Sequence, residues 1–488
     1  MISKSFFKSS IIFTIGGSLP MIGSLLMLPF FTNYLNELNY TQISFYISFS
    51  YLMQIIFSLS IESYFGVKYT QLHESETEQK LFTGKVALLL VSFGLLLLLI
   101  ISLFGNKLFG IIFADQVQMS FWPYGFYSLL TAFFNSFFKT ASMVLIYKKQ
   151  ANQFLVYNII NFILTVLITV LGLKMYPNSL LGPIYGRLYS GIIIFLLGFY
   201  IFYKNGTFKL NNTYIKDILY FSIPYCGFVL FTWLITQVDR YVLQNKITLQ
   251  DLNTYDLAIK CFFGIMFIQN SLMAVVFPKV FEFWAKNKEL KTTTETNRYF
   301  NVFNILNILM ICSFYIVLPL VYPLIIKNKK FYESDVYIGL LGTTYVTQGI
   351  ISLYMATIMF TKRLNVLLKI YGLSALIQLI LLFVLTNYFG LIGAIYSGIA
   401  IKLIQIILSK LFTKSIFKYE YNFYKIELLP YSFIIINIIQ FNIAKTYNLY
   451  FYVTQLFFYL IITYFLFKNE IIKTLVNFKI IKPKTFTP

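Results

Sequence analysis

Residues 217–244 read D-I-L-Y-F-S-I-P-Y-C-G-F-V-L-F-T-W-L-I-T-Q-V-D-R-Y-V-L-Q. The stretch is an apolar helix long enough to cross a membrane, because a bilayer core needs about 20 mostly apolar residues in a helix. Near its far end it carries an acid–base pair, Asp239-Arg240. A charged side chain at that depth costs at least about 2.5 kcal/mol and is therefore a functional hypothesis by default. The stretch predicts a membrane helix with a functional polar end.

The composition extends this prediction to the whole chain. Of its 488 residues, 58% are hydrophobic and 12% are charged, and the mean hydropathy is +0.73. A soluble protein would carry about 25% charged residues. The net charge of +21 does not indicate nucleic-acid binding, because lysines and arginines gather in cytoplasmic loops and beside anionic lipid. We therefore predict a polytopic membrane protein in contact with lipids, and no nucleic-acid partner.

Apolar segments recur along the chain and predict an all-α protein of about fourteen transmembrane helices. No predicted loop is long enough to fold as a separate domain. The predicted segments are 11–31, 42–67, 83–104, 120–147, 151–175, 180–203, 217–244, 254–280, 299–326, 335–360, 364–388, 391–413, 427–444 and 450–468.

The basic residues of the predicted loops set the orientation. They cluster on the side that holds both termini, for example at 148–149, 279–298 and 410–425. The opposite side carries few, namely Lys107, Lys174, Lys246, Lys327, Lys329, Lys330 and Lys445. Because cytoplasmic loops are rich in lysine and arginine, both termini are predicted to lie in the cytoplasm.

The chain also repeats itself. Residues 180–191, L-L-G-P-I-Y-G-R-L-Y-S-G, align without gaps on 391–402, L-I-G-A-I-Y-S-G-I-A-I-K. Pro20 in the first segment matches Pro224 in the seventh. Six helices repeated once about an axis along the membrane normal is a known transporter design. We predict a six-helix lobe over 1–210, a second over 211–425 related by a pseudo-two-fold axis, and two additional helices with a basic tail over 426–488.

Eight charged residues of the predicted helices are candidates for burial in the membrane. Asp256 and Lys260 are one turn apart and could neutralise each other. Glu62, near a helix end, could reach the headgroups. Lys139, Arg187 and Lys402 have no acid nearby in sequence, so they are expected to face a water-filled interior, which would favour an anionic ligand such as phosphate. The full set is Glu62, Lys139, Arg187, Asp239, Arg240, Asp256, Lys260 and Lys402.

No metal site is expected. Cys226, Cys261 and Cys312 each stand alone in apolar runs, and His73 lies in a polar loop. None has the Cys/His spacing of a zinc site.

One longer pattern resembles a known family. The segment S-I-P-Y-C-G-F-V-L-F-T-W-L-I-T-Q-V-D-R-Y-V-L at 222–243, followed by L-N-T-Y-D-L-A-I-K at 252–260, is similar to the Pro…Trp…Asp-Arg…Tyr-x-x-Ala-x-Lys stretch of Wzx-type polysaccharide flippases. These belong to the MOP superfamily with the lipid II flippase MurJ and the MATE exporters. The G-R-L-Y-S-G motif at 186–191 is also similar.

The resemblance implies a function. It implies an inner-membrane flippase that carries an undecaprenyl-diphosphate-linked oligosaccharide repeat unit outward, for O-antigen or capsule, by alternating access driven by an ion gradient. It implies no cofactor beyond a proton or sodium ion, and partners among polysaccharide polymerase and chain-length proteins. The residues that would contact diphosphate or acidic sugar are Lys139, Arg187, Arg240, Lys260 and Lys402, and those for ion coupling or gating are Glu62, Asp239 and Asp256.

Two other functions compete with this prediction. A MATE-like exporter of small cations typically carries an acid in its first helix, and residues 11–31 contain none. A membrane polysaccharide polymerase or ligase would be an enzyme, usually with a large external loop holding arginines and histidines. The predicted external loops are short and lack histidine, and no nucleophile–base pair is visible. The sequence therefore favours a non-enzymatic flippase, without identifying its glycan.

Overall fold

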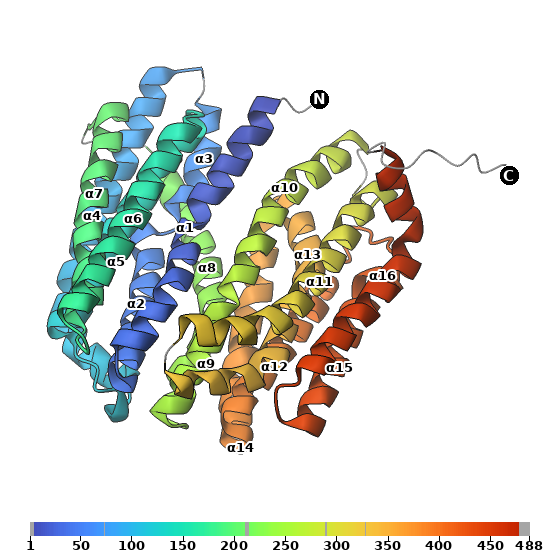
Figure 1. The fold of residues 1–488 in the computed structure, drawn as a ribbon. Helices are drawn as coiled ribbons and strands as arrows, with labels where there is room; N and C mark the ends of the chain where they lie inside the picture. The colour runs from blue at the N-terminus through green and yellow to red at the C-terminus, as the bar shows by residue number, and fades with distance from the viewer. Residues whose placement is uncertain (1–3, 73, 210–213, 288–289, 327, 478–488) are drawn as a thin grey trace. The chain divides into compact units, whose positions relative to one another are not determined.

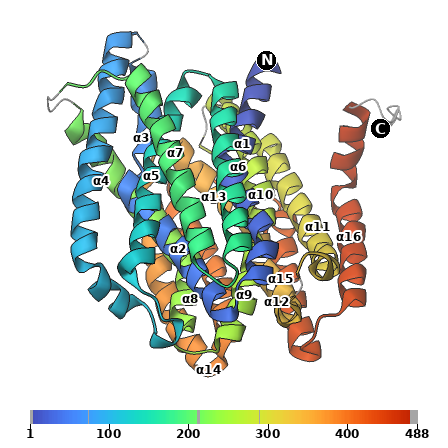
Figure 2. The same ribbon diagram turned by 60° about the vertical axis from the view of Figure 1, so that its left-hand side comes forward.

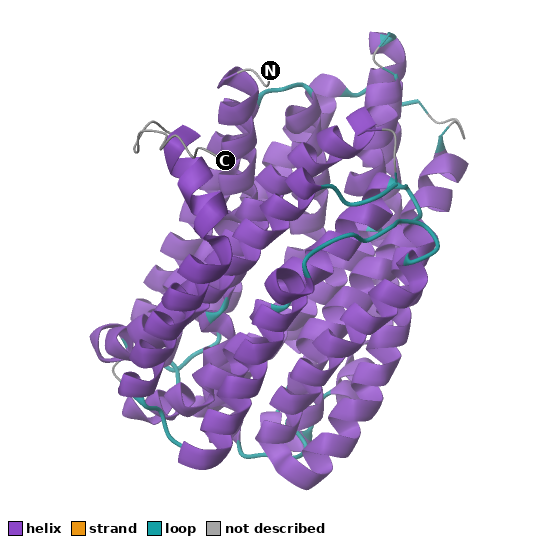
Figure 3. Ribbon diagram, turned by 90° about the vertical axis from the view of Figure 1, so that its right-hand side faces the viewer, coloured by secondary structure: helices purple, strands orange, loops and turns teal. Residues whose placement is uncertain are grey.

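The described part of the chain consists of helices joined by loops (Figures 1 and 3). The computed structural model describes residues 4–72, 74–209, 214–287, 290–326 and 328–477. Within them no strand forms, and one isolated bridge pairs Lys291 with Lys418. The α-helices are α1 (Lys4–Tyr34), α2 (Glu37–Ser58), α3 (Ile61–Gln71), α4 (Glu76–Ile112), α5 (Phe126–Tyr147), α6 (Ala151–Met175), α7 (Leu181–Asn205), α8 (Ile215–Leu243), α9 (Leu249–Cys261), α10 (Phe263–Asn287), α11 (Thr294–Ile325), α12 (Asp335–Val346), α13 (Gln348–Phe360), α14 (Leu364–Thr413), α15 (Leu429–Ala444) and α16 (Leu449–Asn477).

Four short helical turns join some of these helices. They are η1 (Asp115–Val117), η2 (Phe121–Gly125), η3 (Lys329–Ser334) and η4 (Tyr424–Leu428).

The protein is a multi-pass membrane protein. Twelve helical stretches of the described chain are long and apolar enough to cross a membrane, and every predicted segment from 42–67 onward falls on one of them. The predicted number of fourteen differs for two reasons. The segments 364–388 and 391–413 both lie within α14, and α1, which carries the segment 11–31, is not among the twelve. The predicted all-α fold is therefore confirmed, and the number fourteen is approximate.

Gly390 explains why two predicted helices form one element. It interrupts α14 with φ 53° and ψ −129°, a conformation that residues with a Cβ atom rarely adopt. The chain reverses there, since Gln378 before the break donates a hydrogen bond to Ser397 after it, at 3.4 Å. The predicted segments are thus the two arms of a helical hairpin.

Contacts divide the chain into two compact units, which we describe separately. Unit 1 comprises Met1–Phe267, Ile325–Glu333 and Arg363–Gln405, and unit 2 comprises Ile268–Leu324, Ser334–Lys362 and Ile406–Pro488. The predicted lobes at 1–210 and 211–425 and the appended 426–488 rest on an internal repeat, which these units do not test. That division stays a prediction.

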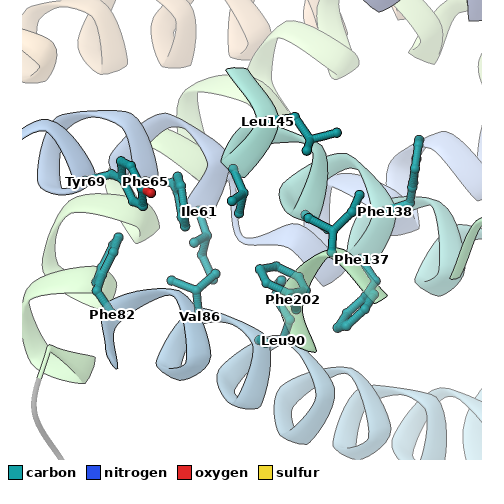
Figure 4. Packing of buried hydrophobic residues seen from close by; sticks show 14 of the residues in the cluster. Ile61, Phe65, Tyr69, Phe82, Val86, Leu90, Phe137, Phe138, Leu145 and Phe202 are labelled. Atoms are coloured by element: carbon teal, nitrogen blue, oxygen red, sulfur yellow. The ribbon is translucent and has the colours of Figure 1, made fainter. Parts of the chain in front are cut away.

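Aromatic packing forms a core of unit 1 (Figure 4). Side chains from α3, α4, α5 and α7 meet there, and Phe65, Phe82 and Phe137 are almost fully buried. The helices α5, α6 and α7 lie side by side in both Figure 1 and Figure 2. Ring contacts stabilise the packing of these helices, for example that of Phe137 with Phe195, whose ring centroids lie 4.7 Å apart. Such packing matters because lipid is as apolar as the helix surfaces, so there is no hydrophobic driving force between them.

Some membrane helices are broken, and the backbone at two of these breaks is satisfied locally. In unit 1 the residues Leu59 and Ser60 adopt positive φ between α2 and α3, and the Ser58 hydroxyl accepts the Ser60 N–H at 3.1 Å. In unit 2 the break between α12 and α13 frees the carbonyl of Tyr345, which accepts from Asn307 at 2.9 Å and from Gln269 at 3.0 Å. Irregular backbone inside a membrane protein requires such partners.

Glycine allows close helix contacts in unit 1. Gly182 at the start of α7 meets the backbone of Gly172 in α6, and a Cβ at Gly182 would lie 2.5 Å from the Gly172 carbonyl carbon. Its repeat counterpart, Gly393, has a similar position, with a built Cβ 2.1 Å from the Leu385 carbonyl oxygen. Small residues let membrane helices approach at backbone distance. The repeated glycine in the sequence therefore marks the tight end of a helical hairpin in both copies.

We predict that Gly182→Ala destabilises the protein by about 1–3 kcal/mol, because the added methyl group meets backbone that can yield only by separating α6 from α7. Thermal unfolding of the purified protein in detergent measures this. Gly110→Ala is the matched control, since nothing lies within 4 Å of its Cβ position. Equal unfolding temperatures for the two variants would contradict the packing argument.

Candidate functional site

Three charged side chains meet in the interior of unit 1. Asp256 of α9 forms ion pairs with Arg240 of α8 at 2.7 Å and with Lys260 of α9 at 2.6 Å. The side chains of Arg240 and Asp256 are each 5% exposed, and that of Lys260 is 9% exposed. We call Arg240, Asp256 and Lys260 the buried triad. The predicted pair of Asp256 and Lys260, one turn apart, is confirmed, and Arg240 is a second partner that the sequence did not predict.

The triad is tied to α2 through one hydroxyl. Ser44 donates to the Asp256 carboxylate at 2.8 Å and accepts from the Lys260 ammonium at 3.0 Å. A buried ion pair is tolerated only when further hydrogen bonds satisfy its remaining groups. The sequence spacing of α2 and α9 gave no sign of this contact, which joins residues 212 positions apart.

Arg240 keeps unused hydrogen-bonding capacity. Its Nε and Nη2 atoms are buried and have no hydrogen-bond partner among the described residues. A guanidinium carries five N–H donors in a planar fork that matches phosphate or carboxylate. Two cations also share one carboxylate in the triad, which leaves it with a net positive charge.

Asp239, the neighbour of Arg240, points elsewhere. Its carboxylate accepts from the Tyr255 hydroxyl and from the backbone N–H of Arg240, the latter at 2.8 Å. The two sequence neighbours thus have separate partners, Asp256 for Arg240 and Tyr255 for Asp239.

Lys139 of α5 is paired, contrary to the expectation that it lacks an acid. Its ammonium lies 2.6 Å from the carboxylate of Glu62 in α3. The two residues are 77 positions apart, so no local spacing could indicate the contact. The Glu62 side chain is 11% exposed and does not extend freely to a headgroup, whereas that of Lys139 is 49% exposed.

Arg187 and Lys402 have no ion-pair partner among the described residues. The Arg187 guanidinium lies 5.7 Å from the centre of the Tyr51 ring, a cation–π contact that leaves its charge uncompensated. Lys402 is half-buried in α14. Only Arg187 of the two lines the cavity described next.

A cavity of about 690 Å³ lies within unit 1 and brings four of the five predicted cations together. It is bounded by α1, α2, α5, α6, α7, α8, α9 and the start of α10. No carboxylate is among its lining residues, and its charged lining residues are Lys139, Arg187, Arg240 and Lys260. Lys402 and the three predicted coupling acids, Glu62, Asp239 and Asp256, do not line it, although Glu62 and Asp256 each hold one or two of its cations.

The cavity also carries uncharged polar residues that the sequence analysis missed. They recur every three or four positions, so each helix turns one polar stripe inward. A search for polar residues at helical spacing within apolar segments would have found them. The stripes are Ser44, Ser48, Tyr51 and Gln54 on α2, Thr131, Asn135 and Ser142 on α5, and Asn158, Asn161, Thr165 and Thr169 on α6.

The described residues contain no group of three or more His, Cys, Asp or Glu side chains that could hold a metal ion. Cys226, Cys261 and Cys312 are buried and form no disulfide among the described residues. His73 lies outside the described residues.

Comparisons with known sequences reach only part of the chain. No family model matches it. Protein 1 of the Lsg locus of Haemophilus influenzae is 26% identical over 286 residues, which cover 57% of this chain. The match spans 66% of that relative's length, slightly less than two thirds.

Comparisons of structure cover nearly the whole chain. The lipid II flippase MurJ in an inward closed conformation superposes with a TM-score of 0.67 at 13% identity, over 94% of this chain and 100% of that one. A MATE transporter in the straight conformation gives 0.61 at 13% identity, over 84% and 96%. An inward-facing multidrug resistance MATE family transporter of the MOP superfamily gives 0.58 at 14% identity, over 85% and 96%. The chain therefore has the fold that MurJ and MATE transporters share.

We predict that Asp256→Asn lowers the free energy of unfolding by about 3–5 kcal/mol, because it leaves two buried cations without a carboxylate. Chemical unfolding in detergent micelles measures the change. Glu62→Gln is the matched control and is expected to cost less than about 1 kcal/mol, since Lys139 is half exposed and water can replace its partner. Equal losses of stability in the two variants would contradict the conclusion that the buried triad contributes more to stability than the pair of Glu62 and Lys139.

Proposed function

We propose that this protein is a flippase for an undecaprenyl-diphosphate-linked oligosaccharide repeat unit, of the kind used for O-antigen or capsule. It would move this lipid from the cytoplasmic to the outer leaflet of the bacterial inner membrane, with both termini in the cytoplasm. The observation that carries the proposal is the cavity of unit 1, which lies among membrane-spanning helices and is lined by four cations and no carboxylate.

The cations suit a diphosphate. Arg240 has two nitrogen atoms, Nε and Nη2, without a hydrogen-bond partner among the described residues, and Arg187 has no acid partner among them. A diphosphate offers many oxygen acceptors and negative charge, which arginine and lysine bind through charge-assisted hydrogen bonds. In a site shielded from bulk water these interactions are stronger than in solution. Lys139 and Lys260 also line the cavity and would add charge, and Lys402 remains a proposed contact outside the lining.

Ion pairs that a ligand can exchange would support alternating access. A phosphate bound at Arg240 and Lys260 competes with Asp256 for the same cations. Binding of substrate would therefore loosen the links between α8, α9 and α2, which is the differential contact that a conformational change requires. Asp256, Asp239 and Glu62 are the proposed residues for gating or for coupling to a proton or sodium gradient.

The same fold occurs in MATE transporters, so the fold alone does not distinguish an exporter of cationic drugs from a flippase of anionic lipids. The charge of the cavity lining favours one of the two. A cationic drug would enter a cavity that carries four like charges on its lining and would be repelled. An anionic lipid headgroup would be attracted. The cavity therefore supports a flippase of anionic lipids over an exporter of small cations. Membrane lipids and the polymerase and chain-length proteins of the same pathway are the proposed partners.

We predict that the wild-type protein restores surface glycan in a strain lacking the flippase for this chain's own glycan, and that Arg187→Ala lowers the restored glycan at least about tenfold. The loss corresponds to roughly 1.4 kcal/mol of binding to one charged group. Surface glycan and accumulated lipid-linked intermediate are measured together, at matched membrane expression.

Arg363→Ala is the control, because this arginine is exposed and lies outside the cavity lining. Accumulated intermediate should rise with Arg187→Ala and not with Arg363→Ala. Full restoration by Arg187→Ala would reject the cavity as the substrate site. Failure of the well-expressed wild type in its own glycan pathway would reject the flippase.

A further inference from the structure

The uncharged polar stripes of α5 and α6 differ in chemistry from the cations that line the same cavity. In α5 the Asn135 amide donates to the Thr131 carbonyl at 2.8 Å, and in α6 the Asn158 amide donates to the Phe154 carbonyl at 2.8 Å. A carbonyl oxygen can only accept, so the orientation of each amide is fixed by its own helix. Each asparagine therefore keeps its Oδ1 acceptor for the cavity.

The hydroxyl groups of α5 that line the cavity also donate their hydrogens to carbonyl groups of their own helix. Thr131 donates to the Tyr127 carbonyl at 2.9 Å, and Ser142 donates to the Lys139 carbonyl at 2.7 Å. Their hydrogens are used within the helix, and their oxygen lone pairs remain free to accept. The wall formed by α5 and α6 is therefore rich in acceptors, whereas Arg187 and Arg240 supply donors.

A chain of hydrogen bonds links the acceptor wall to Arg187. Ser190, one turn after Arg187 in α7, donates to the Arg187 carbonyl at 3.1 Å and lies 3.0 Å from the Thr165 hydroxyl of α6. Thr165 in turn lies 3.3 Å from the Asn161 amide oxygen. The acceptors of α6 are thus tied to the turn of α7 that carries Arg187, through its backbone carbonyl.

Helix association alone does not account for this wall. The contact of Thr165 with Ser190 joins α6 to α7 and has a structural role of its own. Asn135 and Asn158, in contrast, make their hydrogen bonds within their own helices, and both line the cavity. Polar side chains inside a membrane protein face the interior when they serve a ligand or water.

From this arrangement we infer that Asn135 and Asn158 form a sugar subsite, which accepts hydrogen bonds from hydroxyl and acetamido N–H groups of the sugar next to the diphosphate. The inference rests on the proposed flippase function. A phosphate has no hydrogen to donate to these amide and hydroxyl acceptors and could use only the second N–H of each asparagine, whereas a pyranose carries several donors. Asn135, Asn158 and Arg187 line the same cavity, so we assign the subsite to the sugar that adjoins the diphosphate.

The test compares two lipids on purified protein: undecaprenyl diphosphate and undecaprenyl diphosphate N-acetylglucosamine. Their dissociation constants are measured in detergent by competition with a fluorescent prenyl diphosphate. The wild type should bind the sugar-bearing lipid about tenfold more tightly than the sugar-free one, as two further hydrogen bonds would give. The double variant Asn135→Ala/Asn158→Ala should reduce this ratio to less than about twofold and leave the affinity for undecaprenyl diphosphate as it was.

Asn152→Ala is the matched control, because Asn152 is an exposed asparagine of α6 outside the cavity lining. It should preserve both affinities, and thermal unfolding verifies that each variant is folded. If the wild type binds both lipids equally, the subsite is rejected while the proposed function stands. Equal weakening of both lipids in the double variant would also reject it. If the wild type binds neither lipid, the proposed function fails, and the subsite fails with it.

Discussion

The structure of unit 1 depends on one shared carboxylate. Asp256 holds both Arg240 and Lys260 and receives the Ser44 hydroxyl, so three helices meet at a single ionic centre. Burying an unpaired charge in a low-dielectric interior is energetically costly, and removing the carboxylate would leave two cations without this partner at once. The same centre retains unsatisfied N–H groups on Arg240. The buried triad therefore both connects the helices and leaves hydrogen-bond donors of Arg240 available to an anion.

The cavity lining combines cations with uncharged hydrogen-bond acceptors. Cations on α5, α7, α8 and α9 supply charge, and the amides and hydroxyls of α5 and α6 supply acceptors. Such a lining fits a ligand that is anionic at one point and rich in hydroxyl groups beside it. A lipid-linked glycan has this distribution, because its diphosphate adjoins a sugar. The fold shared with MurJ and MATE transporters provides the helical framework. The side chains that line the cavity provide the preference for an anionic, hydroxyl-rich ligand.

Much of the fold could be predicted from the sequence, since apolar segments long enough to cross a bilayer can hardly form anything but helices. The pair of Asp256 and Lys260 was predictable for a similar reason, because one helical turn brings them together. The contacts of Arg240 with Asp256 and of Glu62 with Lys139 were not, because each joins different helices and requires the tertiary packing. The break at Leu59 and Ser60 also escaped prediction, as neither residue is a glycine or proline that would signal it.

The most direct test of the account is transport by the purified protein in liposomes. A fluorescent undecaprenyl-diphosphate saccharide is placed in both leaflets, and its accessibility to an impermeant quencher is followed over time. The account predicts that protein-containing vesicles allow all of the label to be quenched and that empty vesicles protect the inner half. Equal protection in vesicles with and without well-folded protein, tested with and without a proton or sodium gradient, would contradict it.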